Sequence, residues 1–504
     1  MSFYQRCVQL MVIVLPTCLS ACMVGPNFHQ PDAPKVSRYN ATPLPAKTAR
    51  TPYAGQAGKA QAYVYTQDIP ADWWYLFHSP EINRLVEIGL ANSPNLASAI
   101  AALRQAQEAV NAQIGNSLFP AVNAGLSGER QRFNDASLGT NSSSIFNTFN
   151  ASVNVSYTLD VFGGARRQIE ALQAQVDYQQ FQLLAAYLTL TTNIVTTAVT
   201  IASLEEQIEA TQALVKDEEQ QLAILQKQFH LGGIAAPVLL TQQTLVEQTR
   251  ATLPPLEKSL SQSRHALAVL LGDYPDTNFP HINLETLNLP AKLPVSLPSK
   301  VVRQRPDVRA SEALWHAASA QVGVATANLF PQFTLTGAYG WSSNTASALF
   351  EPQNKIWNYM TQITQPIFHG GALLASRREA IDAYDQSAAQ YRQTVLQAFQ
   401  NVADVLRALE TDARTFQAQK AAETAARQNL KITQEQYFLG AINYLNLLTA
   451  EQQYHQTLIS RIQAQATRYT DTAALFQALG GGWWNRHQKC DPINPTKASL
   501  TCPV

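Results

Sequence analysis

The chain has 504 residues, of which 46% are hydrophobic and 14% charged, and its 36 basic residues are balanced by 36 acidic ones. Because no basic excess is available to neutralise phosphates, the composition excludes a simple nucleic-acid binder. The sequence contains no run of about 18 apolar residues, so we expect neither a membrane-spanning helix nor a helix-bundle transporter.

The first 21 residues have the pattern of a secretory signal peptide. Arg6 provides the charged n-region, an apolar stretch follows over residues 10–15, and the segment Leu19–Cys22 reads Leu-Ser-Ala-Cys. This segment resembles a bacterial lipobox, in which Cys22 becomes the lipidated first residue; an ordinary signal peptide with an incidental cysteine is the alternative. In such lipoproteins an Asp after the Cys marks retention in the inner membrane, so Met23 implies the outer membrane.

Two cysteines would remain unmodified in the mature chain. Cys7 and Cys18 lie in the predicted signal peptide, and Cys22 would carry the lipid, which leaves Cys490 and Cys502 in a tail that contains prolines. In an oxidising periplasm these two could form a disulfide. Two free thiols are the alternative, and the sequence does not decide between them.

The sequence repeats its own plan. The segment Gln228–Gly232 (Gln-Phe-His-Leu-Gly) matches Gln436–Gly440 (Gln-Tyr-Phe-Leu-Gly) at an offset of 208 residues. Several such matches in the same order predict two tandem repeats. The predicted order is a signal peptide (1–21), a lipid-anchored extended segment with a first helix (22–90), repeat 1 (91–272), an equatorial belt (273–301), repeat 2 (302–480) and a tail (481–504).

Repeat 1 begins with a predicted helix over Asn92–Asn116, followed by two strands within 120–162. The clearer strand has a period of 2, with one apolar and one polar face. Its apolar residues are Ala151, Val153, Val155, Tyr157 and Leu159, and its polar residues are Asn150, Ser152, Asn154, Ser156 and Thr158. A weaker partner strand runs near Val122, Ala124 and Leu126, and the loop between the strands is polar.

A helical hairpin over 165–272 completes repeat 1. Its long helix, Arg166–Leu231, carries apolar residues at every seventh position, the spacing of a coiled-coil seam; these are Ile208, Val215, Leu222 and Phe229. After a Gly-Gly turn a helix returns as far as Gly272, and Pro254-Pro255 should kink or break it.

Repeat 2 has the same predicted elements: a helix, two strands within 331–368 and a hairpin over 372–480. Its long helix spans Leu373–Leu439, and its return helix lacks a proline pair. Its strands also alternate, with aromatic and aliphatic residues on one face; these are Phe333, Leu335, Tyr339, Trp341, Trp357, Tyr359 and Ile363.

Four amphipathic strands cannot close a membrane barrel, since the smallest such barrels have about eight strands. Open strand edges are not tolerated in lipid. The chain must therefore pool its strands with copies of itself. Two copies would give a plugged cylinder and three would give twelve strands around a water-filled lumen, and the polar inward face favours the open version. A soluble β-sandwich half joined to a coiled coil is the alternative.

The mature chain from Cys22 to Trp484 resembles the TolC-like outer membrane factors, and within them the lipoprotein branch that serves resistance-nodulation-division efflux pumps. The segments that carry this resemblance are Cys22–Phe28, Asp72–Trp74, Arg305–Arg309, Leu329–Pro331, Gln365–Phe368 and Ala478–Trp483. It implies a mainly α, α+β fold in which each repeat contributes two transmembrane β-strands and a long periplasmic helical hairpin. It also implies a homotrimer with a twelve-stranded β-barrel on a twelve-helix α-barrel. Residues Asn134–Asn147 and Ser343–Asn354 would then be extracellular loops.

The resemblance also implies a closed periplasmic gate just after the second hairpin turn, at Leu445, Asn446 and Thr449. Many family members have aspartates at the positions of Asn446 or Thr449, and this chain has none there. We therefore expect a gate closed by apolar and neutral contacts, with less attraction for cations. The alternative is that these residues simply pack the helix turn.

The hairpin turns at Leu231, Gly232, Leu439 and Gly440 are implied docking sites for a periplasmic adaptor protein. The implied partners are two further copies of the chain, this adaptor, an inner-membrane pump and outer-membrane lipid, with no nucleic acid. Apart from the covalent lipid on Cys22, no cofactor is expected.

Motifs of enzymes and metal sites are missing from the sequence: it contains no His-x-x-x-His, no Walker A and no Cys-x-x-Cys pattern. The acidic pairs Glu205-Glu206 and Glu218-Glu219 are interpreted as solvated charge on an exposed helix face.

We therefore expect no enzyme, but a passive exit duct that is anchored in the outer membrane and extends into the periplasm. It would pass drugs or other small molecules from the pump and adaptor to the outside. The alternatives are the outer-membrane duct of an ABC-type (type I) secretion system and a structural periplasmic lipoprotein that does not conduct.

Overall fold

The computed structural model describes residues 23–36, 38–65, 67–134 and 143–486. These residues are mainly helical and form two compact units that each combine pieces of both sequence repeats. The sheet unit comprises Met1–Pro31, Ala102–Gln179 and Ala310–Arg392, and the helical unit comprises Asp32–Ala101, Gln180–Arg309 and Gln393–Val504.

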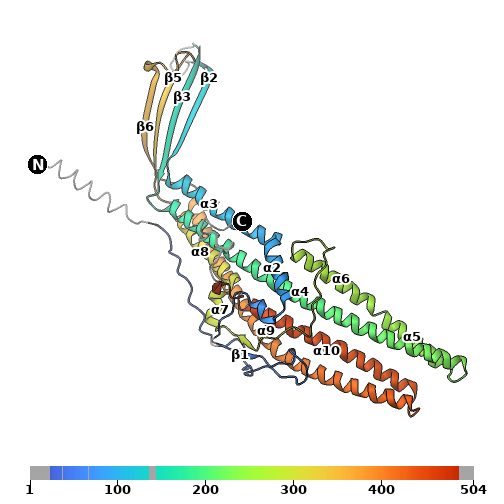
Figure 1. The fold of residues 1–504 in the computed structure, drawn as a ribbon. Helices are drawn as coiled ribbons and strands as arrows, with labels where there is room; N and C mark the ends of the chain where they lie inside the picture. The colour runs from blue at the N-terminus through green and yellow to red at the C-terminus, as the bar shows by residue number, and fades with distance from the viewer. Residues whose placement is uncertain (1–22, 37, 66, 135–142, 487–504) are drawn as a thin grey trace. The chain divides into compact units, whose positions relative to one another are not determined.

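The sheet unit contains a four-stranded antiparallel sheet with the order β2-β3-β5-β6 (Figure 1). The strands are β2 (Ala121–Asn134), β3 (Ser143–Leu159), β5 (Gln332–Ser343) and β6 (Lys355–Thr364). The central pair β3–β5 joins the two repeats. Within the described residues, β2 and β6 each have a neighbour on one side only, so both edges of the sheet are open.

The sheet has one apolar and one polar face, as the alternation predicted. Val153 lies opposite both Ala124 and Tyr339, and Tyr339 lies opposite Trp357. Opposed residues share a face of the sheet, so most apolar residues of the four strands line one side, while Ile356 and Met360 of β6 lie on the other. Tyr359 is 80% exposed in the single chain. The other side carries Asn123, Ser152, Asn154, Ser156, Thr334, Thr336, Asn358 and Gln362.

The first hairpin extends further than predicted, because residues 143–147 belong to β3 and not to the loop. In this extension Arg130 pairs with Asn147 and Arg132 with Ile145, so the apolar face ends there. The Arg132 guanidinium donates to Ser143 Oγ at 2.9 Å, across the end of the hairpin. The part of β3 below this point, from Phe149 to Leu159, carries the apolar face. Its length fits the roughly 9–11 residues with which a tilted strand spans a bilayer.

The two repeats form matching helices. α4 (Gly164–His230) and α9 (Ala372–Phe438) are both 67 residues long, and both their ends differ by the predicted offset of 208. The shorter helices α3 (Pro94–Leu118) and α8 (Pro306–Ala327) precede the strands of each repeat. The helix predictions for repeat 1 thus agree with the structure to within two residues at α3 and α4, while the repeat boundaries themselves stay a prediction.

The return helices differ between the repeats, as the proline pair predicted. In repeat 1, α5 (Ala236–Arg250) ends and α6 (Leu253–Leu270) begins with Pro254 and Pro255 in its first turn. A proline is tolerated there because the first helical N–H groups have no intrahelical acceptor. In repeat 2 the same span is one continuous helix, α10 (Tyr444–Ala478).

An aromatic cluster forms part of the core of the helical unit. The short helix η1 (Trp73–Phe77) buries Trp73 completely, and its ring stacks on Phe476 of α10 at 5.1 Å. This contact explains the Trp-Trp motif that carried the family resemblance. The helix α2 (Pro80–Asn92) follows η1. The belt contains β4 (Lys292–Pro294), which pairs in parallel with β1 (Ala62–Val64). The belt also contains the start of α7 (Pro298–Gln304).

The predicted seam of the long helix is only partly buried. Ile208 and Val215 are buried, but Phe229, close to the turn, is 39% exposed. Among the described residues, α4 also contains a window that is long and apolar enough to cross a membrane, which the sequence count did not anticipate. Its threonines interrupt any strictly apolar run. Since 61% of this window is buried inside the chain, it fits a core helix.

Candidate functional site

The two hairpin turns of the helical unit have the same backbone design. Gly232 and Gly440 adopt positive φ angles of 77° and 71°, which a side chain with a Cβ would disfavour. At the first turn the N–H of Gly233 donates to Gln228 O and that of Gly232 to Phe229 O, the paired bonds of a Schellman motif. The second turn repeats both bonds at the same offset.

Both turns present bare leucines to the surroundings. Leu231 is 86% exposed and Leu439 is 78% exposed. A Cβ added to Gly232 or Gly440 would meet no atom within 4 Å, so no part of the chain that the structure describes lies against either glycine. All four residues predicted as docking tips thus lie exposed, and their role stays a prediction.

The predicted gate residues lie on the first turns of α10. Leu445, Asn446 and Thr449 are all exposed, whereas Leu447 and Leu448 between them are buried. The helix therefore packs through the two buried leucines, which weighs against packing as the main role of the three predicted residues. Their place at a gate stays a prediction, because a single copy has no opposing residues.

A buried polar network close to the predicted gate residues was missed by the sequence reasoning. The Tyr444 hydroxyl of α10 donates to Gln242 Oε1 of α5 and also lies 3.1 Å from Gln221 Oε1 of α4. Gln221 Nε2 in turn donates to Glu451 Oε1. Three helices are thus tied together within two turns of the gate residues.

The second carboxylate of this network is Glu218. It accepts from Thr249 Oγ1 at 3.0 Å, and its backbone carbonyl accepts from Gln242 Nε2 at 2.9 Å. Glu218 is 1% exposed, so the prediction of an exposed Glu218-Glu219 pair is wrong for its first member, while Glu219 is exposed and pairs with Arg250. The heptad offered a signal, because position 218 falls on the seam between Val215 and Leu222.

Burial shifts the acidity of both carboxyl groups. It raises the pKa of Glu451 to about 7, the bond from Gln221 lowers it, and the nearby Glu218 and Asp217 charges raise it. Burial likewise raises the pKa of Glu218, against the lowering effect of Thr249. Each carboxyl group keeps one oxygen without a partner in the structure. Protonation therefore favours the packed arrangement of α4, α5 and α10.

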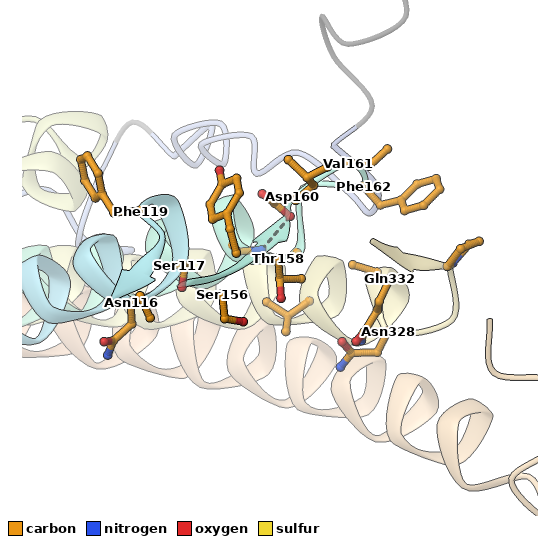
Figure 2. A pocket seen from close by; sticks show the side chains of 18 residues that line it. Asn116, Ser117, Phe119, Ser156, Thr158, Asp160, Val161, Phe162, Asn328 and Gln332 are labelled. Atoms are coloured by element: carbon orange, nitrogen blue, oxygen red, sulfur yellow. Dashed lines mark hydrogen bonds between the residues drawn. The ribbon is translucent and has the colours of Figure 1, made fainter. Parts of the chain in front are cut away.

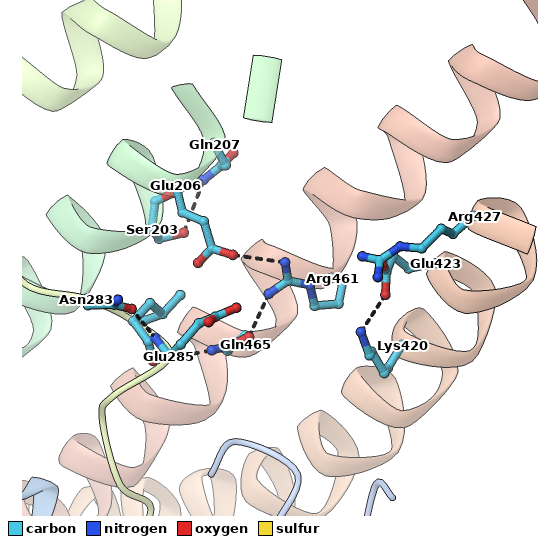
Figure 3. Close-up of polar contacts among 11 residues, drawn as sticks. Ser203, Glu206, Gln207, Asn283, Glu285, Lys420, Glu423, Arg427, Arg461 and Gln465 are labelled. Carbon is cyan, nitrogen blue, oxygen red and sulfur yellow. Dashed lines mark hydrogen bonds and ion pairs between the residues drawn. The ribbon is translucent and has the colours of Figure 1, made fainter. Parts of the chain in front are cut away.

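Further ion pairs join α10 to α4 and lie within α9 (Figure 3). Arg461 of α10 donates to Glu206 of α4 at 2.9 Å and to Gln465 at 2.8 Å. Glu206 is therefore paired across two helices, so the expectation that it is solvated charge on an exposed face is wrong. On α9, the fully buried Glu423 accepts from both Lys420 and Arg427. Over the described residues, no group of three or more His, Cys, Asp or Glu is arranged to hold a metal ion.

The foot of the sheet in the sheet unit surrounds a cavity of about 380 Å³ (Figure 2). Asp160 follows β3 and accepts from the backbone N–H groups of Ala165 and Arg166, each at 3.0 Å, which caps the start of α4. Phe162 stacks on Phe330 at 4.7 Å. The Leu-Phe-Pro motif therefore helps to fix where the strands join the helices.

The Arg-Pro-Asp motif also has a local explanation. Arg305 makes two bonds to the Asp307 carboxylate, at 3.0 and 2.6 Å, and a third to Ala478 O at the end of α10. A cation is favourable at a helix C-terminus. Arg305 therefore joins Asp307, in the first turn of α8, to the end of α10. All three residues lie in the helical unit. Cys22, Cys490 and Cys502 lie outside the described residues.

Comparisons with known proteins agree on one family. The model of the outer membrane efflux protein family matches residues 85–273 and 297–481. A pyoverdine export outer membrane protein (OpmQ) of Pseudomonas putida is 30% identical over 88% of this chain and 94% of its own length. The probable outer membrane lipoprotein SilC of Salmonella typhimurium is 26% identical over 94% of this chain and 97% of its own length.

Solved structures show the same fold. The outer membrane channel MtrE of Neisseria gonorrhoeae aligns with a TM-score of 0.77 at 26% identity, over 93% of this chain and 100% of that one. The CmeC channel of Campylobacter jejuni aligns with a TM-score of 0.83 at 22% identity, over 94% of this chain and 98% of that one.

The raised pKa of Glu451 predicts that the hairpin tips loosen as the pH rises. The folded-state pKa of about 7 exceeds the ordinary 4.5. The stabilising contribution is therefore full below pH 4.5 and is lost as the pH rises to 7, by on the order of 3 kcal/mol. Hydrogen exchange across residues 440–455, corrected for intrinsic rates, should accelerate between pH 5 and 8.

The variant Glu451→Gln should remain protected over this whole pH range, because its amide carries no charge. Glu435→Gln, which changes an exposed glutamate on α9, is the matched control and should behave as the unaltered chain. Equal exchange at both pH values in the unaltered chain would contradict the prediction.

Proposed function

The chain belongs to the outer membrane efflux protein family, and on this basis we propose that three copies form a passive exit duct. The duct passes drugs or other small molecules from an inner-membrane pump and a periplasmic adaptor to the outside of the cell. As a member of this family the chain is an outer-membrane channel component and not an enzyme, and its proposed lipid anchor is Cys22.

The observation that carries this proposal is the sheet with one apolar face and two open edges. Unpaired backbone N–H and C=O groups each cost several kcal/mol in the bilayer core. The edges β2 and β6 must therefore be paired, and copies of the same sheet supply matching edges. Three sheets give twelve strands, whose Asn, Ser and Thr faces would line a water-filled lumen.

The domain roles follow from the same arrangement. The hairpins α4–α5–α6 and α9–α10 would form the periplasmic tunnel, with residues 273–301 as its belt. The type I secretion duct differs from this proposal only in the pump that energises it. The structural lipoprotein differs in a measurable way, because it would not conduct.

Conductance across planar lipid bilayers tests the proposed function. Purified trimers should produce discrete, uniform current steps, whereas monomers separated by size-exclusion chromatography should produce none, because a single sheet encloses no lumen. A stable, folded monomer together with silent trimers would favour the structural lipoprotein.

The gate proposal predicts that new charge at the constriction changes ion selectivity. Leu445→Asp and Thr449→Asp should each increase the preference for cations by about twofold or more, because a ring of three carboxylates attracts cations. Reversal potentials under a salt gradient measure this preference.

Thr241 provides the matched control, because it occupies the position of Thr449 in repeat 1 and is also exposed. Thr241→Asp should leave selectivity unchanged if only the second hairpin lines the constriction. Unchanged conductance and selectivity in both gate variants would exclude these positions from the gate.

The docking proposal predicts that charge at the tips weakens adaptor binding. Leu231→Asp and Leu439→Asp should each reduce co-purification of the adaptor by about tenfold, the loss expected when an apolar anchor worth about 1.4 kcal/mol is removed. Leu240→Asp, at a leucine of α5 that is 58% exposed, is the control and should retain binding. Normal binding by both tip variants would place the adaptor elsewhere.

A further inference from the structure

The N-terminal arm, residues 23–28, directly follows the proposed lipidated cysteine and lies within the sheet unit. The Val24 N–H donates to Phe162 O at 3.1 Å, between the end of β3 and the start of α4. A Cβ on Gly163 would lie 2.4 Å from Met23 Cγ, so the backbone touches the arm at its first described residue. The arm therefore begins at the foot of the sheet.

One arginine holds this arm. Arg167 of α4 is 1% exposed, and its guanidinium donates to Val24 O at 3.1 Å, to Gly25 O at 3.3 Å and to Asn27 Oδ1 at 2.7 Å. Its remaining terminal nitrogen pairs with Glu170 at 2.7 Å. A buried guanidinium is costly without partners, and three of the four acceptors found here belong to the arm.

The far end of the arm is also fixed. Phe28 stacks on the His316 ring at 4.6 Å and meets Trp315 edge-on at 5.5 Å, both on α8. His316 Nε2 lies 3.0 Å from Glu170 Oε1, which links this stack to the partner of Arg167.

Glycine is required in the middle of the arm. Gly25 has a φ of 91°, and a Cβ at this position would lie 2.4 Å from the Cα of Gly323 on α8. The link between β3 and α4, the backbone of α8 and one buried cation thus enclose a segment of only six residues. A segment that merely passed along the surface would need neither the glycine contact nor the buried arginine.

We propose that Arg167 is the positioning residue of a built-in clamp that seats the acylated N-terminus at the foot of the sheet. This inference rests on the proposed acylation of Cys22. The clamp would leave the lipid one residue from Met23, which contacts the point where β3 joins α4. The acyl chains and the base of the barrel then enter the membrane at the same surface.

The clamp matters because an untethered arm would not specify where the anchor lies. If the chain were held only from residue 32 onward, a flexible segment of ten residues would spread its end over a root-mean-square distance of roughly 17 Å. That distance is about half the thickness of the hydrocarbon core. With the clamp closed, lipid insertion and strand insertion become one coordinated event.

Two variants open the clamp by different routes, and both are made in the full chain. Arg167→Ala removes the donors, and Gly25→Ala displaces the arm without altering Arg167. Arg166→Ala is the matched control, since Arg166 is the preceding residue on the same helix but pairs with Asp160 and not with the arm. On purified protein, we would measure the hydrogen exchange of the arm amides and the mass of the mature N-terminus, which reports its acylation. The third measurement is the fraction of the chain that forms membrane-inserted, protease-resistant trimer.

In both clamp variants we expect exchange of the arm amides to rise at least tenfold while exchange within β3 stays unchanged, which a general loss of structure would not produce. Acylation should persist, and the inserted fraction should fall; the Arg166→Ala chain should match the unaltered one.

Arm exchange that stays at the unaltered level in Arg167→Ala would overturn the clamp. An opened arm with normal insertion would overturn its positioning role. An unacylated mature N-terminus would overturn the lipid anchor, a result that the mass spectrum gives independently of the exchange data.

Discussion

The hydrogen bonding of the two sheet edges is the constraint on which the rest of the structure depends. A strand edge in water can bind solvent, but an edge in lipid must find another strand. Because β2 and β6 are both open and the sheet has an apolar face, the single chain is stable in a membrane only as part of a closed ring. Association with further copies is therefore a requirement of the backbone, and three copies give the twelve-stranded ring of the proposed duct.

The polar face gains its role from the same closure. Asn, Ser and Thr side chains bind water readily without carrying a net charge, so a ring lined with them admits many solutes and retains few. The residues at the predicted gate are also neutral.

Periodicity predicted most of the fold, because the long helices and the sheet faces are set by repeating local patterns. The two faces of β3 and the break at Pro254 could be read directly from residue types. For Glu218 the heptad gave only a position on the seam, because whether a glutamate there is solvated or buried depends on which helices pack against it. The clamp also escaped prediction, since Arg167 and Asn27 lie 140 residues apart and no local pattern connects them.

The differences between the repeats fall where the proposed functions differ. Both hairpins turn with the same glycine motif, but α10 starts with Asn443, whose side chain caps the N–H of Asn446, while Ala235 before α5 offers no such cap. A cap of this kind stabilises a helix start by about 1 kcal/mol. The second return helix is thus fixed at its first turn and unbroken over 35 residues, whereas the first is interrupted after Arg250. The predicted gate residues therefore lie on a continuous return helix, whereas the matching positions of repeat 1 lie on an interrupted one.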